Sequence, residues 1–177
     1  AVFVVVYISF MGYAGDRVTA WLHPELDPGD TGYQILQSLY AIGSGGLFGL
    51  GYGKSRQKYL YLPFQYNDYI FAVICEELGL VGAMAIVALF AVTILRGYWI
   101  ALNARDRFST VLAAGLVTLI AVQTILNLCV VTNLLPSTGI ALPFFSYGGT
   151  ALAVNLGEMG IVLGISRGRN RRKIQEA

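Results

Sequence analysis

Residues 109–135 read STVLAAGLVTLIAVQTILNLCVVTNLL, and this stretch contains no charged side chain. A helix needs about 20 predominantly apolar residues to cross the hydrocarbon core of a bilayer, and this run is longer. Its polar residues include Gln123 and Asn127, four apart on one helical face, and Asn133 near the end. Such residues commonly hydrogen-bond between membrane helices. The stretch therefore predicts a membrane-spanning helix.

Two other stretches have the same character, residues 69–95, interrupted by Glu76 and Glu77, and residues 145–166. The apolar run over 1–14 is shorter, and we expect it to be a truncated membrane helix. The whole chain is 56% hydrophobic and 12% charged, with a mean hydropathy of +0.63, whereas a soluble domain carries about 25% charged residues. We predict an all-α, polytopic membrane protein with about four transmembrane helices.

Basic residues indicate how these helices are oriented. Arginine and lysine concentrate in the loop over 96–108 and in the tail over 167–177, whereas the turn over 136–144 contains neither. Short loops rich in Lys and Arg stay in the cytoplasm. The 96–108 loop and the C-terminal tail are therefore predicted to be cytoplasmic, and the long 15–68 loop and the 136–144 turn extracytoplasmic.

The remaining composition excludes several functions. A net charge of +2, without a surface that combines basic and aromatic residues, argues against nucleic acid as a partner. His23 is the single histidine, so a histidine-based metal site is not expected, although carboxylates and lipid phosphates can hold a divalent cation. Cys75 and Cys129 lie within apolar runs and are predicted to be small buried side chains.

Gly53-Lys54-Ser55 matches the last three residues of a phosphate-binding P-loop motif. That motif requires a further glycine where this chain has Phe48. The segment is also predicted to lie on the side of the membrane without ATP. A nucleotide site is therefore not expected.

The long outer loop contains a segment with helical periodicity, TGYQILQSLYAIG. One predicted face carries Ile35, Leu36, Leu39 and Ile42, and the other Gln34, Gln37 and Ser38. This pattern predicts a short amphipathic helix lying on, or dipping into, the outer leaflet.

A glycine-rich and then basic segment follows. Six glycines occur from Gly43 to Gly53, which favours tight turns and close approach to a partner, with a flexible hinge as the alternative. Lys54, Arg56 and Lys58 then place three cations within five residues. Their natural partners are phosphates, either of a lipid-linked substrate or of ordinary membrane lipids.

Asp68 lies where the outer loop meets the 69–95 span. It can serve as a helix N-cap, because Asp is preferred there, or as a general base with a raised pKa at the membrane boundary. Glu76 lies about 12 Å further along a helix, and Glu77 points to another face. Neither glutamate is expected to pair with Asp68, and packing or a buried ion pair is the preferred interpretation.

The turn after the 109–135 span is rich in proline and glycine and leads into a helix with small, polar first residues, including Ser146 and Gly148. Exposed backbone amides at such a helix start can face an anion.

Three stretches carry a family resemblance: GKSRQKYLYLP (53–63), DYIFAVICEELGLVGA (68–83) and LLPSTGIALPFFSYGGTAL (134–152). In this order they closely resemble signature stretches of the SEDS family (shape, elongation, division and sporulation), which contains FtsW, RodA and SpoVE. The sequence of the first stretch is most similar to the FtsW and SpoVE branch. Members of the family have ten membrane helices, and this chain resembles the seventh to the tenth.

The resemblance implies a peptidoglycan glycosyltransferase that polymerises lipid II, a disaccharide on undecaprenyl pyrophosphate, outside the bacterial cytoplasmic membrane with a class B penicillin-binding protein. Asp68 would be the catalytic base that deprotonates the 4-hydroxyl of the acceptor sugar. A divalent cation, Mg or Mn, would assist the leaving diphosphate. The residues assigned to substrate binding are Lys54, Arg56, Gln57, Lys58, Ser146 and Gly148.

Two other functions remain open. A lipid II flippase would require Glu76, Glu77 and Glu158 to line a path through the membrane. A non-catalytic scaffold would instead bind division or elongation partners without forming polymer.

Overall fold

The computed structural model describes residue 15 and residues 17–26, 31–55 and 68–175. Within these ranges the regular structure is helical, without strands. The elements are a helical stretch over 17–22, the 3-10 helix η1 (Pro24–Leu26), and the α-helices α2 (Thr31–Ser44), α4 (Ile70–Leu102), α5 (Arg107–Val131) and α6 (Gly149–Gln175). The all-α prediction is confirmed, and the helix predicted over 1–14 lies outside the described residues.

Three of the described helices are long and apolar enough to span a membrane: α4, α5 and the part of α6 over 149–168. They overlap the three complete spans that the sequence predicts, with different ends. Large apolar side chains are exposed along all three, including Leu95, Val111 and Leu163. A surface of this kind is suited to lipid rather than water. The chain is a multi-pass membrane protein.

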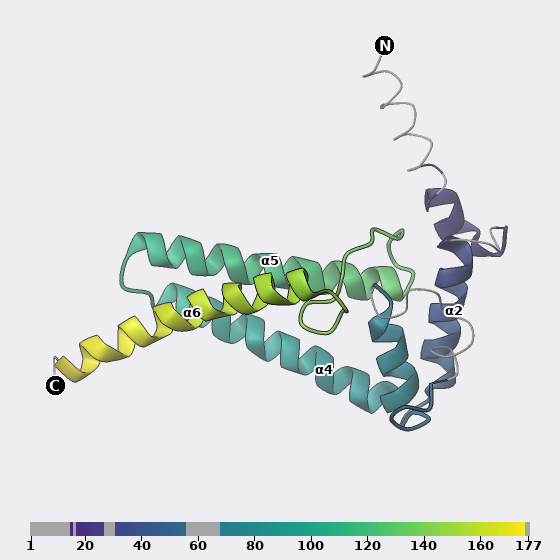
Figure 1. Ribbon diagram of the computed structural model, residues 1–177, viewed down its shortest axis with the longest axis horizontal. Coiled ribbons are helices and arrows are strands. Elements are labelled where there is room, and N and C mark those ends of the chain that lie inside the picture. The colour runs from purple at the N-terminus through teal and green to yellow at the C-terminus, as the bar shows by residue number, and fades with distance from the viewer. Residues whose placement is uncertain (1–14, 16, 27–30, 56–67, 176–177) are drawn as a thin grey trace, which may run out of the picture.

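The three long helices form one bundle, in which α4 and α5 lie alongside each other and α6 crosses them (Figure 1). A Cβ atom added to Gly97 would lie 2.5 Å from the side chain of Val117, so the glycine allows α4 and α5 to approach closely. Tyr98 and Thr118 share a hydrogen bond of 2.9 Å between their hydroxyls. The α4–α5 connection lies at one end of the bundle, and α2 packs near the start of α4 at the other.

Helix α4 is broken, contrary to the continuous span predicted over 69–95. Gly79 has φ 69° and ψ −171°, and it separates a first segment, residues 70–78, from a second segment, residues 80–102. At about 1.5 Å per residue the second segment is about 34 Å long, enough by itself to cross a bilayer. The break arises from tertiary contacts with residues 45–51, which hydropathy does not register.

The cytoplasmic loop and tail predicted by hydropathy are more helical than expected. Helix α4 continues to Leu102, so the connection to α5 is short, and α6 continues through most of the 167–177 tail. Asp106 begins α5 by capping it: its carboxylate accepts the Ser109 backbone N–H at 3.0 Å and the Ser109 hydroxyl at 2.9 Å. The bilayer boundaries predicted at residues 95 and 109 stay predictions, because a helix can extend beyond the membrane.

The turn between α5 and α6 is longer than the predicted 136–144. It covers residues 132–148, because α5 ends at Val131 and α6 begins at Gly149. Asn133, with φ 58°, turns the chain away from the α5 axis. Ser146 belongs to this turn, where its hydroxyl accepts the Leu142 backbone N–H at 2.7 Å.

The helix predicted in the outer loop is present as α2, but its buried face differs from the predicted one. Ile35, Ser38 and Ala41 are buried, although the sequence pattern places Ser38 on the polar side. The Ser38 hydroxyl lies 2.8 Å from the Ile35 carbonyl and 3.3 Å from the Val131 carbonyl, at the end of α5. This hydrogen bonding explains why a polar residue faces the protein. The location of α2 at the outer leaflet stays a prediction.

Candidate functional site

Asp68 lies two residues before Ile70, the first residue of the break-containing helix α4. Tyr69 is the N-cap residue of α4 and its side chain makes no capping hydrogen bond, so Asp68 does not occupy the cap position that the sequence offered as an alternative. The Asp68 side chain is half-buried against the 132–148 turn. A Cβ atom added to Gly139, whose φ is 70°, would lie 3.6 Å from Asp68 Oδ2. The carboxylate therefore faces a part of the turn that has no side chain.

A cationic side chain from the helical stretch over 17–22 acts on the same region. Arg17 Nη1 donates to the Ser137 carbonyl at 2.6 Å, and Trp21 Nε1 donates to the Asn133 carbonyl at 3.0 Å. These two bonds attach the stretch to the 132–148 turn across more than a hundred residues of sequence. The sequence does not predict this contact, because no local pattern indicates it.

The electrostatic environment of Asp68 combines two opposing effects. Burial raises the pKa of the Asp68 carboxyl above its ordinary value of 3.8, and the positive charge of Arg17 partly lowers it again. A carboxylate with a raised pKa holds a proton more strongly and is a better general base. The sequence predicts a raised pKa for Asp68 at the membrane boundary, and the direction of this pKa shift agrees with that prediction.

Asn127 ties the elements around Asp68 together. Its Nδ2 group donates to the Asp68 carbonyl at 2.7 Å and to the Ile140 carbonyl at 2.8 Å, and the side chain is fully buried. The sequence predicts hydrogen bonds to a neighbouring helix, whereas the structure shows bonds to the backbone just before α4 and to the 132–148 turn. A single amide from α5 therefore positions both Asp68 and this turn.

Lys54 lies away from Asp68, at the other end of the first segment of α4. Four backbone hydrogen bonds of 2.9–3.2 Å connect the glycine loop, residues 45–53, to the break in α4: Leu50 to Glu76, Gly51 to Glu77, Leu80 to Gly46 and Val81 to Leu47. Lys54 follows this loop with an exposed side chain. The structure thus does not bring Lys54 to the Asp68 carboxylate. Arg56, Gln57 and Lys58 lie outside the described residues.

The glycines in this loop permit close contact between backbones. Cβ atoms added to Gly45 and Gly49 would lie 2.0 Å and 2.2 Å from the carbonyl oxygens of Cys75 and Glu77. One added to Gly79 would lie 2.3 Å from the Gly49 nitrogen. Of the two sequence interpretations, close approach is the one that the structure supports, with the chain itself as the partner.

The two glutamates near the break are buried as predicted. The Ser55 hydroxyl donates to the Glu76 carboxylate, and both side chains are almost completely inaccessible. Glu77 Oε1 is buried without a hydrogen-bond partner among the described residues. Glu158 is also buried, in α6. Cys75 is buried and Cys129 partly buried, and both are free thiols.

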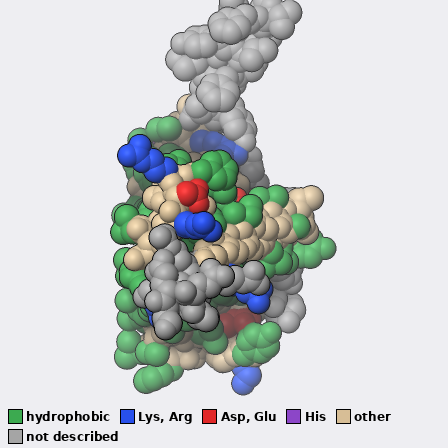
Figure 2. Space-filling model, turned by 90° about the vertical axis from the view of Figure 1, so that its left-hand side faces the viewer, with side chains coloured by type: hydrophobic (Ala, Val, Ile, Leu, Met, Phe, Trp, Pro, Cys, Tyr) green, Lys and Arg blue, Asp and Glu red, His purple; other side chains and the backbone are tan. Residues whose placement is uncertain are grey.

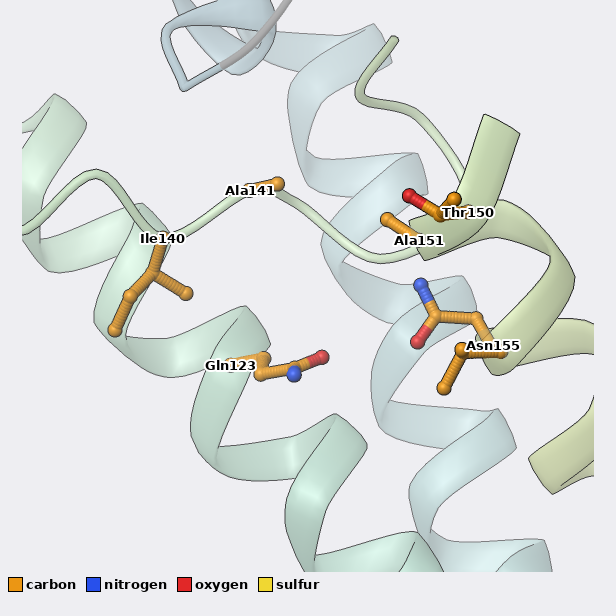
Figure 3. Close-up of a pocket in the computed structure, with 7 residues that line it drawn as sticks. Gln123, Ile140, Ala141, Thr150, Ala151 and Asn155 are labelled. Carbon is orange, nitrogen blue, oxygen red and sulfur yellow. The ribbon is translucent and has the colours of Figure 1, made fainter. Parts of the chain in front are cut away.

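Ser146 and Gly148 line a pocket of about 460 Å³ together with Ile70, the first residue of α4. Of the predicted substrate-binding residues that the structure describes, these two share a pocket with the start of α4, whereas Lys54 does not line it. A second pocket, of about 440 Å³, is lined by Gln123 of α5 and by Thr150 and Asn155 of α6 (Figure 3). Sequence reasoning missed Asn155, although a polar residue inside an apolar run is the signal that could have found it.

The opposite end of the bundle is basic. Arg96, Arg105, Arg107 and Arg167 are exposed there, with Asp106 between two of them. Figure 2 views the molecule from this end, where Lys and Arg atoms lie beside an acidic side chain and hydrophobic side chains cover the flanks. The sequence predicts that the basic loops are segregated from the 136–144 turn, and in the structure the basic end and this turn lie apart.

The described residues do not by themselves form a protein ligand set for a divalent cation. Within the described ranges no group of three His, Cys, Asp or Glu side chains comes together. Asp68 would be a single protein ligand for such an ion.

Comparison with known proteins supports the family resemblance. The model of the family described as "Cell cycle protein" (FtsW, RodA, SpoVE) matches residues 1–171. Stage V sporulation protein E of Bacillus subtilis is 50% identical over 155 residues, which are 88% of this chain and 42% of that protein. The probable peptidoglycan glycosyltransferase FtsW of Geobacter sulfurreducens is 49% identical over 154 residues, which are 87% of this chain and 41% of that protein.

A solved structure is also similar to this chain. It is described as "Structural coordination of polymerization and crosslinking by a peptidoglycan synthase complex", with a TM-score of 0.73 and 29% sequence identity. The similarity covers 96% of this chain and 46% of the solved chain. The chain therefore spans less than half the length of the relatives that it matches.

Proposed function

The chain belongs to the FtsW/RodA/SpoVE family of cell cycle proteins, and from this membership we propose that it carries the catalytic residues of a peptidoglycan glycosyltransferase that polymerises lipid II. The FtsW relatives are named as probable enzymes of this kind. The observation that carries the proposal is the setting of Asp68. It is a half-buried carboxylate with a raised pKa, in front of a glycine and outside any helix-capping role.

In this mechanism Asp68 removes the proton from the 4-hydroxyl of the acceptor sugar. The hydroxyl oxygen forms a bond to the anomeric carbon of the donor, the bond from that carbon to the phosphate oxygen breaks, and undecaprenyl diphosphate leaves. General-base catalysis of this kind contributes roughly 10²–10⁴-fold to a rate. The bare Gly139 opposite Asp68 leaves room for the acceptor hydroxyl.

Anion contacts are proposed for the other predicted residues. Ser146 and Gly148 line the pocket next to Ile70, where the polar part of the lipid substrate would lie beside Asp68. Lys54 is exposed beyond the glycine loop, and with Arg56, Gln57 and Lys58 it would contact the diphosphate or the phosphates of membrane lipids. Preorganised cations stabilise charge that develops on a leaving group.

The proposed cellular setting is the bacterial cytoplasmic membrane. The basic end of the bundle and the C-terminus would face the cytoplasm, and Asp68 the outside, where lipid II is polymerised. A class B penicillin-binding protein would crosslink the product. The peptidoglycan synthase complex with a similar fold supports such a partnership.

A polymerisation assay tests the proposal. A chimera in which this chain replaces the matching region of Geobacter sulfurreducens FtsW supplies the remaining length of the relatives. It is incubated with labelled lipid II and the cognate penicillin-binding protein, and glycan strands are resolved on a gel. We expect Asp68→Asn to reduce polymer formation by at least about 100-fold.

Asp106→Asn is the matched control, because it makes the same chemical change at the basic end of the bundle. Asn caps helices about as well as Asp, so wild-type activity is expected. Equal polymer from Asp68→Asn and the wild type would exclude Asp68 as the base. Lipid II that crosses liposome membranes without polymer from any version would favour a flippase. Co-purification with the penicillin-binding protein, without polymer or transport, would favour a scaffold.

A further inference from the structure

The pocket between α5 and α6 has features that the reaction at Asp68 does not use. We call it the amide pocket, and it is lined by Gln123, Ile140, Ala141, Thr150, Ala151, Val154 and Asn155. Figure 3 shows Gln123 extending from α5 and Asn155 from α6 into the space between the two helices, with Thr150 above Asn155. Its volume of about 440 Å³ lies within the range of roughly 300–1,000 Å³ that is typical of small-molecule sites.

The polar side chains of the amide pocket have no hydrogen-bond partner in the described part of the chain. Among the described residues, none accepts or donates a hydrogen bond to the side chains of Gln123, Thr150 or Asn155, although Asn155 is only 7% exposed. By contrast, the hydroxyls of Thr118 and Thr124 in α5 donate to carbonyls of their own helix. An amide that faces apolar surroundings without a hydrogen-bond partner is unfavourable. A polar ligand in the amide pocket would supply partners for the two carboxamides.

The lining also defines the chemistry of that occupant. Charged residues are absent from the lining within the described chain, so a phosphate or a carboxylate would be unpaired there. Two carboxamides and a hydroxyl offer both donors and acceptors, and Ile140, Ala141 and Val154 provide apolar surface beside them. A neutral ligand with hydroxyl groups, an amide and an apolar face fits this lining.

We propose that the amide pocket binds the acetamido sugar part of the substrate and positions it for Asp68. This inference rests on the proposed function and assigns to the pocket the neutral part of the substrate, apart from its diphosphate. The Asn127 amide links the two places, because it donates to both the Asp68 carbonyl and the carbonyl of Ile140, a pocket residue. Gln123 lies one helical turn from Asn127 on the same face of α5.

Binding is measured first, on the full 177-residue chain in nanodiscs by saturation-transfer NMR. The probe is N-acetylglucosamine, and glucose, which lacks the acetamido group, is the matched ligand. We expect saturation of the acetyl methyl group by the wild type and a weak signal for glucose. The double variant Gln123→Leu/Asn155→Leu should reduce the signal at least about fivefold, because it removes hydrogen bonds worth on the order of 1 kcal/mol each.

Asp68→Asn separates this inference from the proposed function. It should leave sugar binding unchanged while abolishing polymerisation in the chimera. The pocket variant should raise KM for lipid II about tenfold, with a much smaller change in kcat. Full polymerisation activity of the Asp68→Asn variant would exclude Asp68 as the base but would leave the proposed sugar pocket standing. Unchanged sugar binding and KM in the pocket variant would overturn the pocket but not the base.

A second variant keeps the amides and blocks the space. Val154→Phe places a ring in the wall of the amide pocket. It should weaken sugar binding and raise the KM for lipid II. Val111→Phe adds the same ring to an exposed position of α5, at 72% exposure, and should change neither. Equal signals from glucose and N-acetylglucosamine would contradict the proposal. So would wild-type KM values for all pocket variants of the chimera, because the pocket would then not be used by the substrate.

Discussion

The charge state of Asp68 is set by burial and by Arg17. Burial raises its pKa and Arg17 lowers it, with burial as the larger effect. For stability, the protonated form of Asp68 is favoured in the folded protein. This stabilisation is present below the ordinary pKa of 3.8 and is lost as the pH rises through the raised value. For catalysis the direction is opposite, because the base must be ionised.

Removing the charge of Arg17 should therefore change the pH profile of polymerisation. In Arg17→Gln the pKa of Asp68 rises further, so the acid limb of kcat/KM is expected at a higher pH than in the wild type. The measurement is the polymerisation rate of the chimera between pH 4 and about 8. Arg17→Lys keeps the positive charge and should retain most of the wild-type profile. Superimposable profiles for Arg17→Gln and the wild type would show that this charge does not act on Asp68.

At the scale of elements, the break in α4 and the glycine loop form one structural unit. The break frees backbone groups of Glu76, Glu77, Leu80 and Val81, and the loop supplies their hydrogen-bond partners. Within a membrane protein such groups must be satisfied by the protein itself. Irregular backbone at this position is therefore tolerated because it is covered by another part of the chain.

Gly79→Ala should disrupt this unit. The added Cβ would meet the Gly49 nitrogen at 2.3 Å and the Leu47 carbonyl oxygen at 2.6 Å, at a positive φ that alanine disfavours. We expect a loss of about 2–4 kcal/mol in the free energy of unfolding, seen as a lower melting temperature in detergent.

Gly115→Ala is the control in α5, because its Cβ would meet nothing within 4 Å. There alanine should be neutral or stabilise the helix by roughly 0.5–1 kcal/mol. Equal melting temperatures for Gly79→Ala and Gly115→Ala would show that the loop and the break do not pack as described.

At the scale of the whole molecule, the bundle has two chemically different ends. Arg96, Arg105, Arg107 and Arg167 lie toward the end that holds the α4–α5 connection, while Asp68, Arg17 and the 132–148 turn lie at the other end (Figure 1). Segments of the basic end and segments of the Asp68 end alternate along the chain, and the bundle brings each set together at its own end. Such an arrangement is expected of a protein with one cytoplasmic and one extracytoplasmic end.

Cysteine labelling tests this orientation. Lys54→Cys and Arg105→Cys are each introduced into a chain with Cys75 and Cys129 replaced by alanine, and both positions are exposed. In intact spheroplasts a membrane-impermeant maleimide should label Lys54→Cys at once and Arg105→Cys only after permeabilisation. The cysteine-free chain controls for background. Labelling in the reverse order would invert the proposed topology.

The membrane helices, the helix at 31–44 and the separation of basic loops follow from the sequence by itself. Each depends on hydropathy, periodicity or charge within a short stretch, and these local properties act wherever the stretch is placed. The sequence likewise locates Asp68 at the junction of loop and helix. By residue type alone it left the role of Asp68 open between a helix cap and a base.

Only the tertiary structure decided the break at Gly79, the buried face of α2 and the surroundings of Asp68. Arg17 reaches Ser137 across 120 residues, Asn127 reaches Asp68 across 59, and the amide pocket joins side chains of two helices. These features depend on which helices pack together and at what distance, and hydropathy contains no such information. The physical reason is that a hydrogen bond is satisfied by whatever partner the fold brings within about 3 Å, however far apart the two residues lie in the chain.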